Sequence, residues 1–202
     1  MAAGAKRGAA HAPRGEVRII GGAWRSRRIS FPASEELRPT PDRVRETVFN
    51  WLIPHLPGAA CLDLFAGSGA FGFEALSRGA ARAVLVEKRL EAVAALRHNR
   101  EQLKAGQADI VHADAADYLR GPVEAFDIVF IDPPYASGLL GPCAELLEAR
   151  GWLKPDAFIY LEAPQGEAPP LPESWRLMRS KTAGQVGYHL ARRNQQVAEE
   201  PV

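Results

Sequence analysis

The stretch "ACLDLFAGSGAFGFEAL", Ala60 to Leu76, decides the fold of this chain. It begins as an apolar strand and then places Gly67, Gly69 and Gly72 in a GxGxxG pattern at the start of a helix. Only glycine lets the backbone turn this tightly while a ligand lies against it, and the helix N-terminus adds free N–H groups. The pattern predicts a βαβ unit that binds a nucleoside-containing cofactor, unless the glycines serve only to bring helix and strand close together.

Acidic residues near this loop narrow the choice of cofactor. Glu87 ends the next strand, twenty residues after Gly67, where a carboxylate can accept both hydroxyls of an adenosine ribose. Asp63 lies four residues before the first glycine. An acid there would repel the pyrophosphate of NAD but suits the cationic S-adenosylmethionine, and it could instead hold the loop together. Asp114 follows the third strand and suits either an adenine amino group or the cap of the next helix.

The chain after residue 60 alternates strand-like and helical patterns, the clearest helix covering 89–104. This order predicts a doubly wound, Rossmann-like α/β fold whose mostly parallel sheet is covered on both faces. Two β-like runs around Ala183-Gly184 predict an antiparallel C-terminal hairpin at the sheet edge. The expected strands of the parallel part span 60–65, 83–87, 109–112, 126–131 and 157–161.

The fourth strand runs into "DPPY", which suits the binding of a base amine. The lone pair of such an amine is delocalised into the ring, so acceptors on both of its N–H groups are needed to aim it at an electrophile. Asp132 can accept one N–H and the carbonyl of Pro133 the other, while the proline pair fixes the bend. Tyr135 can stack on the base. The alternative is a proline-rich turn in which Asp forms the turn and Tyr covers the core.

The N-terminal quarter of the chain is basic. Residues 1–50 carry ten Lys/Arg and five Asp/Glu, a net charge of +5, whereas the remaining residues carry −4. The segment "VRIIGGAWRSRRISFP", Val17 to Pro32, predicts a small β-hairpin arm around Gly21-Gly22, with basic residues between aromatic ones. A basic arm on a near-neutral body is typical of nucleic-acid binding, and a solvated tail that aids solubility is the alternative.

The next segment, "RPTPDRVRETVFNWL", Arg38 to Leu52, contains a clear helix start. Thr40 suits the cap, Pro41 the first helical position and Asp42 the positive end of the helix dipole. Arg45 lies off the apolar stripe, where it can pair with Glu46 or Asp42. The stripe consists of Val44, Val48, Trp51 and Leu52.

Composition excludes several classes of protein. The two cysteines, Cys61 and Cys143, form no CxxC pair, which predicts neither a disulfide framework nor a zinc or other metal site and fits a reducing cytoplasm. Neither a membrane span nor the apolar core of a signal peptide is expected. The predicted organisation is a disordered basic tail at 1–15, an arm at 16–37, a catalytic domain at 38–193 and a tail at 194–202.

The motifs together resemble the bacterial 16S rRNA guanine-N2 methyltransferases of the small ribosomal subunit. The resemblance covers about Val17 to Arg192 and rests, in order, on "RIIGGAWRSRRI", "LRPTPDRVRETVFNWL", "CLDLFAGSGAFGFEALSRGA", "FIDPPY", "GWL" and "AGQVGYHL". DNA adenine and protein glutamine methyltransferases usually carry Asn where this chain has Asp132. The resemblance implies a seven-stranded class I methyltransferase that uses S-adenosylmethionine and methylates one guanine amine of 16S rRNA within the assembled or assembling 30S subunit. We expect a cytoplasmic monomer.

The resemblance also assigns roles by position. For the cofactor it implies Asp63, Phe65, Ala66, Gly67, Ser68, Gly69, Glu87, Lys88, Asp114 and Ala115. For the base it implies Asp132, Pro133 and Tyr135. The candidates for RNA contacts are Arg18, Trp24, Arg25, Arg27, Arg28, Arg38, Arg43 and Lys181, with Trp24 as an anchor of the arm in the alternative interpretation.

Two other functions fit parts of the sequence. A NAD-dependent oxidoreductase would use the same glycine loop but would leave the DPPY turn and the basic arm without a role. A non-catalytic RNA-binding factor would have no need of the acceptors Asp132 and Glu87.

Overall fold

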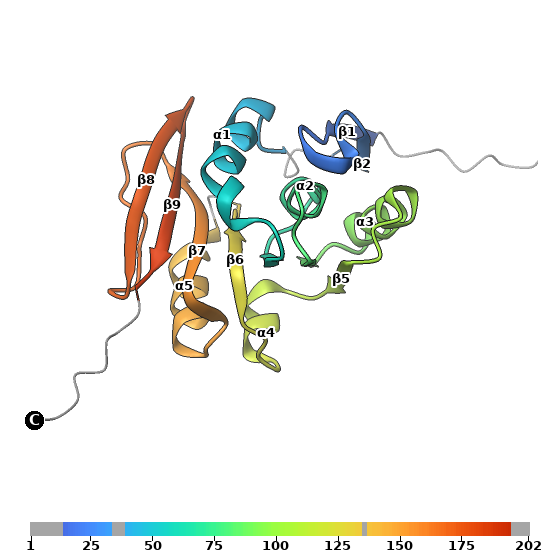
Figure 1. Ribbon diagram of the computed structural model, residues 1–202. Helices are drawn as coiled ribbons and strands as arrows, with labels where there is room; N and C mark the ends of the chain where they lie inside the picture. The colour runs from blue at the N-terminus through green and yellow to red at the C-terminus, as the bar shows by residue number, and fades with distance from the viewer. Residues whose placement is uncertain (1–13, 34–38, 135–136, 195–202) are drawn as a thin grey trace, which may run out of the picture.

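A seven-stranded sheet forms the centre of the molecule in the computed structural model, which describes residues 14–33, 39–134 and 137–194 (Figure 1). The strand order is β5-β4-β3-β6-β7-β9-β8. The bounds are β3 Ala60–Asp63, β4 Arg82–Glu87, β5 Ala108–His112, β6 Phe126–Ile131, β7 Leu153–Pro164, β8 Trp175–Ala183 and β9 Val186–Arg193.

The pairing confirms the predicted fold class. Strands β5, β4, β3, β6 and β7 run parallel to their neighbours, and the final hairpin β8–β9 joins β7 antiparallel. The middle strands are almost continuously apolar because both faces of the sheet are covered. Strand β7 is longer than the predicted 157–161, since it pairs with β6 on one side and with β9 on the other.

Helices cover both faces of the sheet, as Figure 1 shows. On one face lie α1 Asp42–Leu52, α2 Ala70–Ser77 and α3 Leu90–Leu103, with the short helix η2 Ile53–His55 after α1. On the other face lie α4 Ala115–Arg120 and α5 Leu140–Ala149. Each face has its own apolar cluster; on the α1–α2 side the rings of Phe71 and Phe130 stack with centroids 5.0 Å apart.

Helix α1 begins differently from the prediction. Pro41 occupies the N-cap position and no side chain caps the helix, so the expected capping role of Thr40 is wrong. The stripe is largely confirmed, because Val44, Val48 and Leu52 are buried, as is Phe49, which the prediction missed. Trp51 is only partly buried and stacks on Tyr188 of β9, with ring centroids 5.6 Å apart.

The N-terminal arm is an antiparallel hairpin of β1 Arg14–Arg18 and β2 Arg28–Pro32, with the short helix η1 Gly22–Trp24 in its loop. The loop lies directly on α2. Gly22 has φ of +76°, and a Cβ there would lie 1.8 Å from the carbonyl oxygen of Ser77. Only glycine fits both the backbone angle and the close approach, which explains why the arm carries a glycine at this turn.

Arg45 joins the arm to the domain. Its side chain is fully buried, although the sequence placed it off the apolar stripe, because the arm covers that side of α1. One Nη donates to the carbonyl of Arg18 (2.8 Å) and to Asp42 Oδ1 (2.6 Å), while the other lies 3.6 Å from Glu74 Oε2. Glu74 in turn accepts the backbone N–H groups of Ile20 and Gly21. The pairing with Asp42 confirms one of the two predicted partners.

Candidate active site

The candidate site lies at the carboxyl ends of the central strands. The chain order reverses between β3 and β6, which are neighbours in the sheet, and ligands of doubly wound folds bind at such a reversal. Asp63 ends β3, Glu87 ends β4 and Asp132 follows β6. The three acids singled out in the sequence therefore lie along one edge of the sheet.

Asp63 is only 4% exposed and is hydrogen-bonded to the helix that begins at the glycine loop. Its Oδ2 accepts the N–H of Gly72 in the first turn of α2 at 2.9 Å. Burial raises the pKa of Asp63 to about 7; the bond from Gly72 opposes the rise, and the charge of Glu87 adds to it. A carboxylate thus occupies the start of α2, where an anionic pyrophosphate would otherwise bind.

Glu87, at the end of β4, is hydrogen-bonded to the same loop. Its carboxylate accepts the N–H of Gly67 at 2.9 Å and both the N–H and Nε of Arg89 at 2.8 and 3.0 Å. Arg89 Nη2 also lies 3.5 Å from Oε2, so four donors meet a carboxylate with about four acceptor sites, and ligand hydroxyls would have to compete with Arg89. Gly69 has φ of +79°, and a Cβ there would lie 2.6 Å from Leu96, so the loop needs glycine for packing as well as for its turn.

The other predicted cofactor residues surround this loop. Asp114 caps α4, since its Oδ1 accepts the N–H of Ala116 at 2.9 Å, which was the alternative interpretation of this acid. Lys88 is exposed and Phe65 is partly buried. Three further residues of the predicted set are buried, namely Ala66, Ser68 and Ala115. The acids and the tight loop fit a cationic cofactor with a ribose, and among the described residues no cluster suits a metal ion.

Asp132, the residue that follows β6, is the third acid of the candidate site. Its Oδ2 lies 3.4 Å from the Thr40 hydroxyl, which also bonds Oε1 of Glu162 at 3.1 Å. Burial raises the pKa of Asp132 well above its usual value, and the charges of Glu162 and Asp63 raise it further. Pro133 is buried beside it, while Tyr135 lies outside the described residues.

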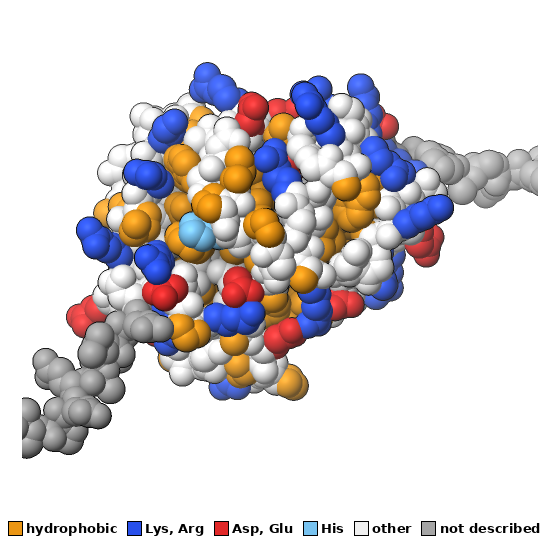
Figure 2. Space-filling model, viewed as in Figure 1, with side chains coloured by type: hydrophobic (Ala, Val, Ile, Leu, Met, Phe, Trp, Pro, Cys, Tyr) orange, Lys and Arg blue, Asp and Glu red, His pale blue; other side chains and the backbone are white. Residues whose placement is uncertain are grey.

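The predicted RNA-binding side chains that the structure describes lie on the arm, on α1 and on β8, and Lys and Arg side chains are scattered over the face shown in Figure 2. Arg18 and Arg28 form exposed ion pairs with acids, and Arg27 donates to the carbonyl of Gln102. Three further candidates, Arg25, Arg43 and Lys181, are exposed and form no ion pair with the described residues. Arg38 lies outside the described ranges.

Trp24 is partly buried and packs against the core, and its backbone N–H donates to the Ser77 hydroxyl at 2.9 Å. These contacts make it an anchor of the arm, as the alternative interpretation had it.

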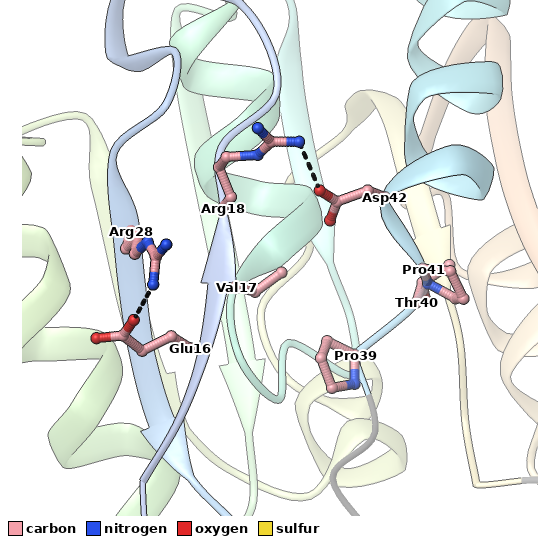
Figure 3. A pocket seen from close by; sticks show the side chains of 8 residues that line it. All are labelled: Glu16, Val17, Arg18, Arg28, Pro39, Thr40, Pro41 and Asp42. Carbon is pink, nitrogen blue, oxygen red and sulfur yellow. Dashed lines mark hydrogen bonds and ion pairs between the residues drawn. The ribbon is translucent and has the colours of Figure 1, made fainter.

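A cavity of about 400 Å³ lies between the arm and the start of α1 (Figure 3). The paired side chains of Arg18 and Asp42 cross one part of it, and those of Arg28 and Glu16 another. Thr40, which bonds Asp132, also lines this cavity. Thr40 is therefore shared between the lining of this cavity and the hydrogen bonds of Asp132.

The sequence analysis missed two features of the site: the acid Glu162, and the contacts of the Thr40 hydroxyl with Asp132 and Glu162. Glu162 is 5% exposed at the carboxyl end of β7, beside Asp132, and it is the only acid in the apolar run "AFIYLEAP". An acid at the end of a buried strand was the same signal that singled out Asp63 and Asp132. Glu74, the acid within the apolar start of α2, carries a similar signal.

The glycine loop, with Asp63 and Glu87 bonded to it, and the Asp-Pro-Pro turn lie at the strand ends where the chain order reverses. This combination of fold and site defines a methyltransferase of the doubly wound α/β class. The family described as conserved hypothetical protein 95 matches residues 17–192.

Curated relatives carry more specific names. Two proteins named ribosomal RNA small subunit methyltransferase D are similar to most of this chain. The one from Escherichia coli is 49% identical over 92% of this chain and 94% of its own length. The one from Haemophilus influenzae is 44% identical over 88% and 94%, respectively. A solved Escherichia coli structure, described as a candidate methyltransferase, has a TM-score of 0.82 and 48% identity, covering 90% of this chain and all of its own. The chain belongs to the conserved hypothetical protein 95 family of methyltransferases.

Proposed function

We propose that this protein transfers the methyl group of S-adenosylmethionine to the N2 amine of a guanine in 16S rRNA of the small ribosomal subunit. The observation that carries the proposal is the placement of Asp132, with its Pro-Pro bend, beside Asp63 on neighbouring parallel strands. The names of the relatives support ribosomal RNA as the substrate. The choice of the guanine amine rests on the family resemblance and on an Asp, rather than an Asn, before the proline pair.

The cofactor would be held by the glycine loop, Asp63, Glu87 and Asp114. S-adenosylmethionine, when bound, supplies an electrophilic methyl group on a positively charged sulfur. Asp63 and Glu87 provide negative charge that favours a cation in the crevice and disfavours a pyrophosphate. The ribose hydroxyls would bond Glu87 in place of the Arg89 guanidinium, which now lies on that carboxylate.

The base would be held by the turn after β6. Asp132 accepts one N–H of the amine and the Pro133 carbonyl the other, while Tyr135 stacks on the ring. As the new N–C bond forms, the amine must lose a proton, and Asp132 lies at the position to accept it. Burial raises the pKa of Asp132, which makes its carboxylate a stronger proton acceptor than an exposed one.

The arm would contact phosphates of the RNA. Arg25, Arg43 and Lys181 are exposed, and Arg18 and Arg28 could exchange their acidic partners for phosphate groups. Such contacts position the RNA without reading its sequence. The substrate would then be the folded 16S rRNA in the 30S particle or a late assembly intermediate, met in the cytoplasm by a monomer of this chain.

Two measurements test the proposal. Titration calorimetry is expected to detect binding of S-adenosylmethionine and none of NAD. Mass spectrometry of 16S rRNA from a strain that lacks the protein is expected to show the loss of one N2-methylguanine, which returns when the protein is supplied. Binding of NAD alone, or an unchanged set of methylated guanines, would overturn the proposal.

A further inference from the structure

Asp132 and Glu162 are neighbours at the ends of two parallel strands. The register of β6 and β7 pairs Phe130 with Tyr160 and Ile131 with Leu161, so the next position on each strand carries a carboxylate. Both acids follow fully buried apolar residues. This arrangement brings a second acid to the carboxylate that the proposed function assigns to the base amine.

A single hydroxyl lies between these two carboxylates. Thr40 Oγ1 is 3.1 Å from Glu162 Oε1 and 3.4 Å from Asp132 Oδ2, and it has only one hydrogen to donate. The hydroxyl of Tyr160 lies 2.5 Å from the same Oε1 of Glu162. Thr40 and Glu162 are almost fully buried, so water does not screen the carboxylates well.

We propose that Thr40 and Glu162 are positioning residues of the methyl-transfer site, which fix the carboxylate of Asp132 and adjust its readiness to accept the proton of the amine. This inference rests on the proposed function. In the step concerned, the N–C bond forms as the S–C bond breaks, and one N–H proton of the amine moves to an oxygen of Asp132. Thr40 holds that carboxylate in place before the step, and Glu162 favours its protonated form afterwards.

The groups that face Asp132 act in opposite directions. Burial and the charges of Glu162 and Asp63 raise the pKa of Asp132, whereas the hydrogen bond from Thr40 lowers it. The hydroxyl of Tyr160 bonds Glu162. Because Asp132 must be ionised to accept a proton, the rate falls on the acidic side of its pKa. Removing Glu162 or Thr40 must therefore move the acidic limb of the rate profile in opposite directions.

The test is single-turnover methyl transfer to 30S particles across a range of pH. Glu162→Gln removes the charge but keeps the shape, and we expect the acidic limb to move to lower pH. Thr40→Val removes the hydroxyl but keeps the branched shape, and we expect the limb to move to higher pH, with a rate about 10- to 100-fold lower at neutral pH. Thr40→Ser restores a hydroxyl and is expected to recover most of the rate.

Matched controls separate positioning from general damage. Thr47→Val lies on α1, where the hydroxyl bonds only the preceding turn, and Glu148→Gln lies on α5, where the acid bonds Arg193 and Trp175. Both controls are expected to keep the wild-type rate profile. Binding of S-adenosylmethionine by all variants, measured by calorimetry, shows that they are folded, and we expect the affinities of Glu162→Gln and Thr40→Val to match the wild type.

The outcomes distinguish this inference from the function on which it rests. If the wild-type protein methylates a guanine N2 amine but both acidic limbs stay in place, only the roles of Thr40 and Glu162 are wrong. Limbs that move together in one direction would overturn those roles as well. If the wild-type protein leaves guanine unmethylated, the proposed function and the inference both fall.

Discussion

Two polar clusters meet the segment Pro39–Asp42, and they differ in charge. The arm cluster consists of Arg45, Glu74, Asp42 and Arg78, in which cations and acids alternate. The crevice cluster consists of Asp63, Asp132 and Glu162 around the Thr40 hydroxyl. Among the described residues, no Lys or Arg forms an ion pair with Asp63 or Asp132.

The difference separates a structural cluster from the cluster to which the proposed function assigns the chemistry. In the arm cluster every charge meets an opposite charge or a backbone group, so the cluster fixes the arm on α2. In the crevice, burial raises the pKa values of Asp63 and Asp132, and the charges of neighbouring acids raise them further. A folded protein tolerates such repulsion where a cation or a proton must be received.

The largest expected effect is on stability, from breaking the arm cluster. Arg45→Met leaves the Glu74 carboxylate buried with Arg78 as its only cationic partner among the described residues. We expect the free energy of unfolding to fall by about 3–5 kcal/mol, measured by urea denaturation. Arg43→Met, an exposed change on the same helix, is the control and is expected to cost less than about 0.5 kcal/mol. Equal losses in the two variants would contradict the structural role of Arg45.

The next effect is on catalysis, from the crevice cluster. Asp132→Asn is expected to lower methyl transfer to 30S particles by about 10²–10³-fold, because an amide neither accepts the proton nor carries the charge. The same change removes a repelling charge, so the melting temperature at neutral pH is not expected to fall. Asp117→Asn, an exposed carboxylate on α4, serves as the control and is expected to keep full activity. A melting temperature well below that of the wild type would show that Asp132 is structural.

A third effect is expected in the dependence of stability on pH. The pKa of Asp63 is about 7 in the folded protein and near 3.8 when unfolded, so the folded state binds more protons between these values. Stability therefore falls as pH rises from about 4 to about 7, by at most about 1.4 kcal/mol per pH unit for this group, and levels off above. Asp63→Asn removes this contribution and should flatten the curve in denaturation series from pH 4.5 to 8. Parallel curves for the two proteins would contradict the raised pKa.

The smallest effects are expected from exposed cations of the predicted RNA surface. Arg25→Ala and Lys181→Ala should leave the free energy of unfolding within about 0.5 kcal/mol of the wild type. If each contacts a phosphate, the slope of log affinity for 30S particles against log salt should fall by about 0.7–0.9. Arg120→Ala, on the opposite face of the sheet, is the control. An unchanged slope in both arm and hairpin variants would remove these residues from the RNA surface.

Much of the fold followed from local patterns. Apolar runs predicted the five parallel strands, and the glycine loop with its acids predicted the edge at which the site lies. Strand ends were less accurate, because β7 is extended by pairing with β9, a contact between segments far apart in sequence.

The errors have one physical cause, since local rules do not see tertiary contacts. Thr40 suited a helix cap, but its hydroxyl bonds acids 92 and 122 residues further along the chain. Arg45 was expected outside the apolar stripe and is nevertheless buried, because the arm covers that side of α1. Both residues take their role from segments that meet only in the folded protein.

The central claim is that the acid after β6 serves the transfer of a methyl group to guanine, and one experiment tests it directly. 30S particles from a strain that lacks the protein are incubated with S-adenosylmethionine and either the wild-type protein or Asp132→Asn, and the 16S rRNA is digested for mass spectrometry. We predict one N2-methylguanine per particle with the wild type and about 10²–10³-fold slower formation with the variant, at equal affinity for S-adenosylmethionine. Equal rates for the two proteins, or a methyl group on another base, would contradict the account.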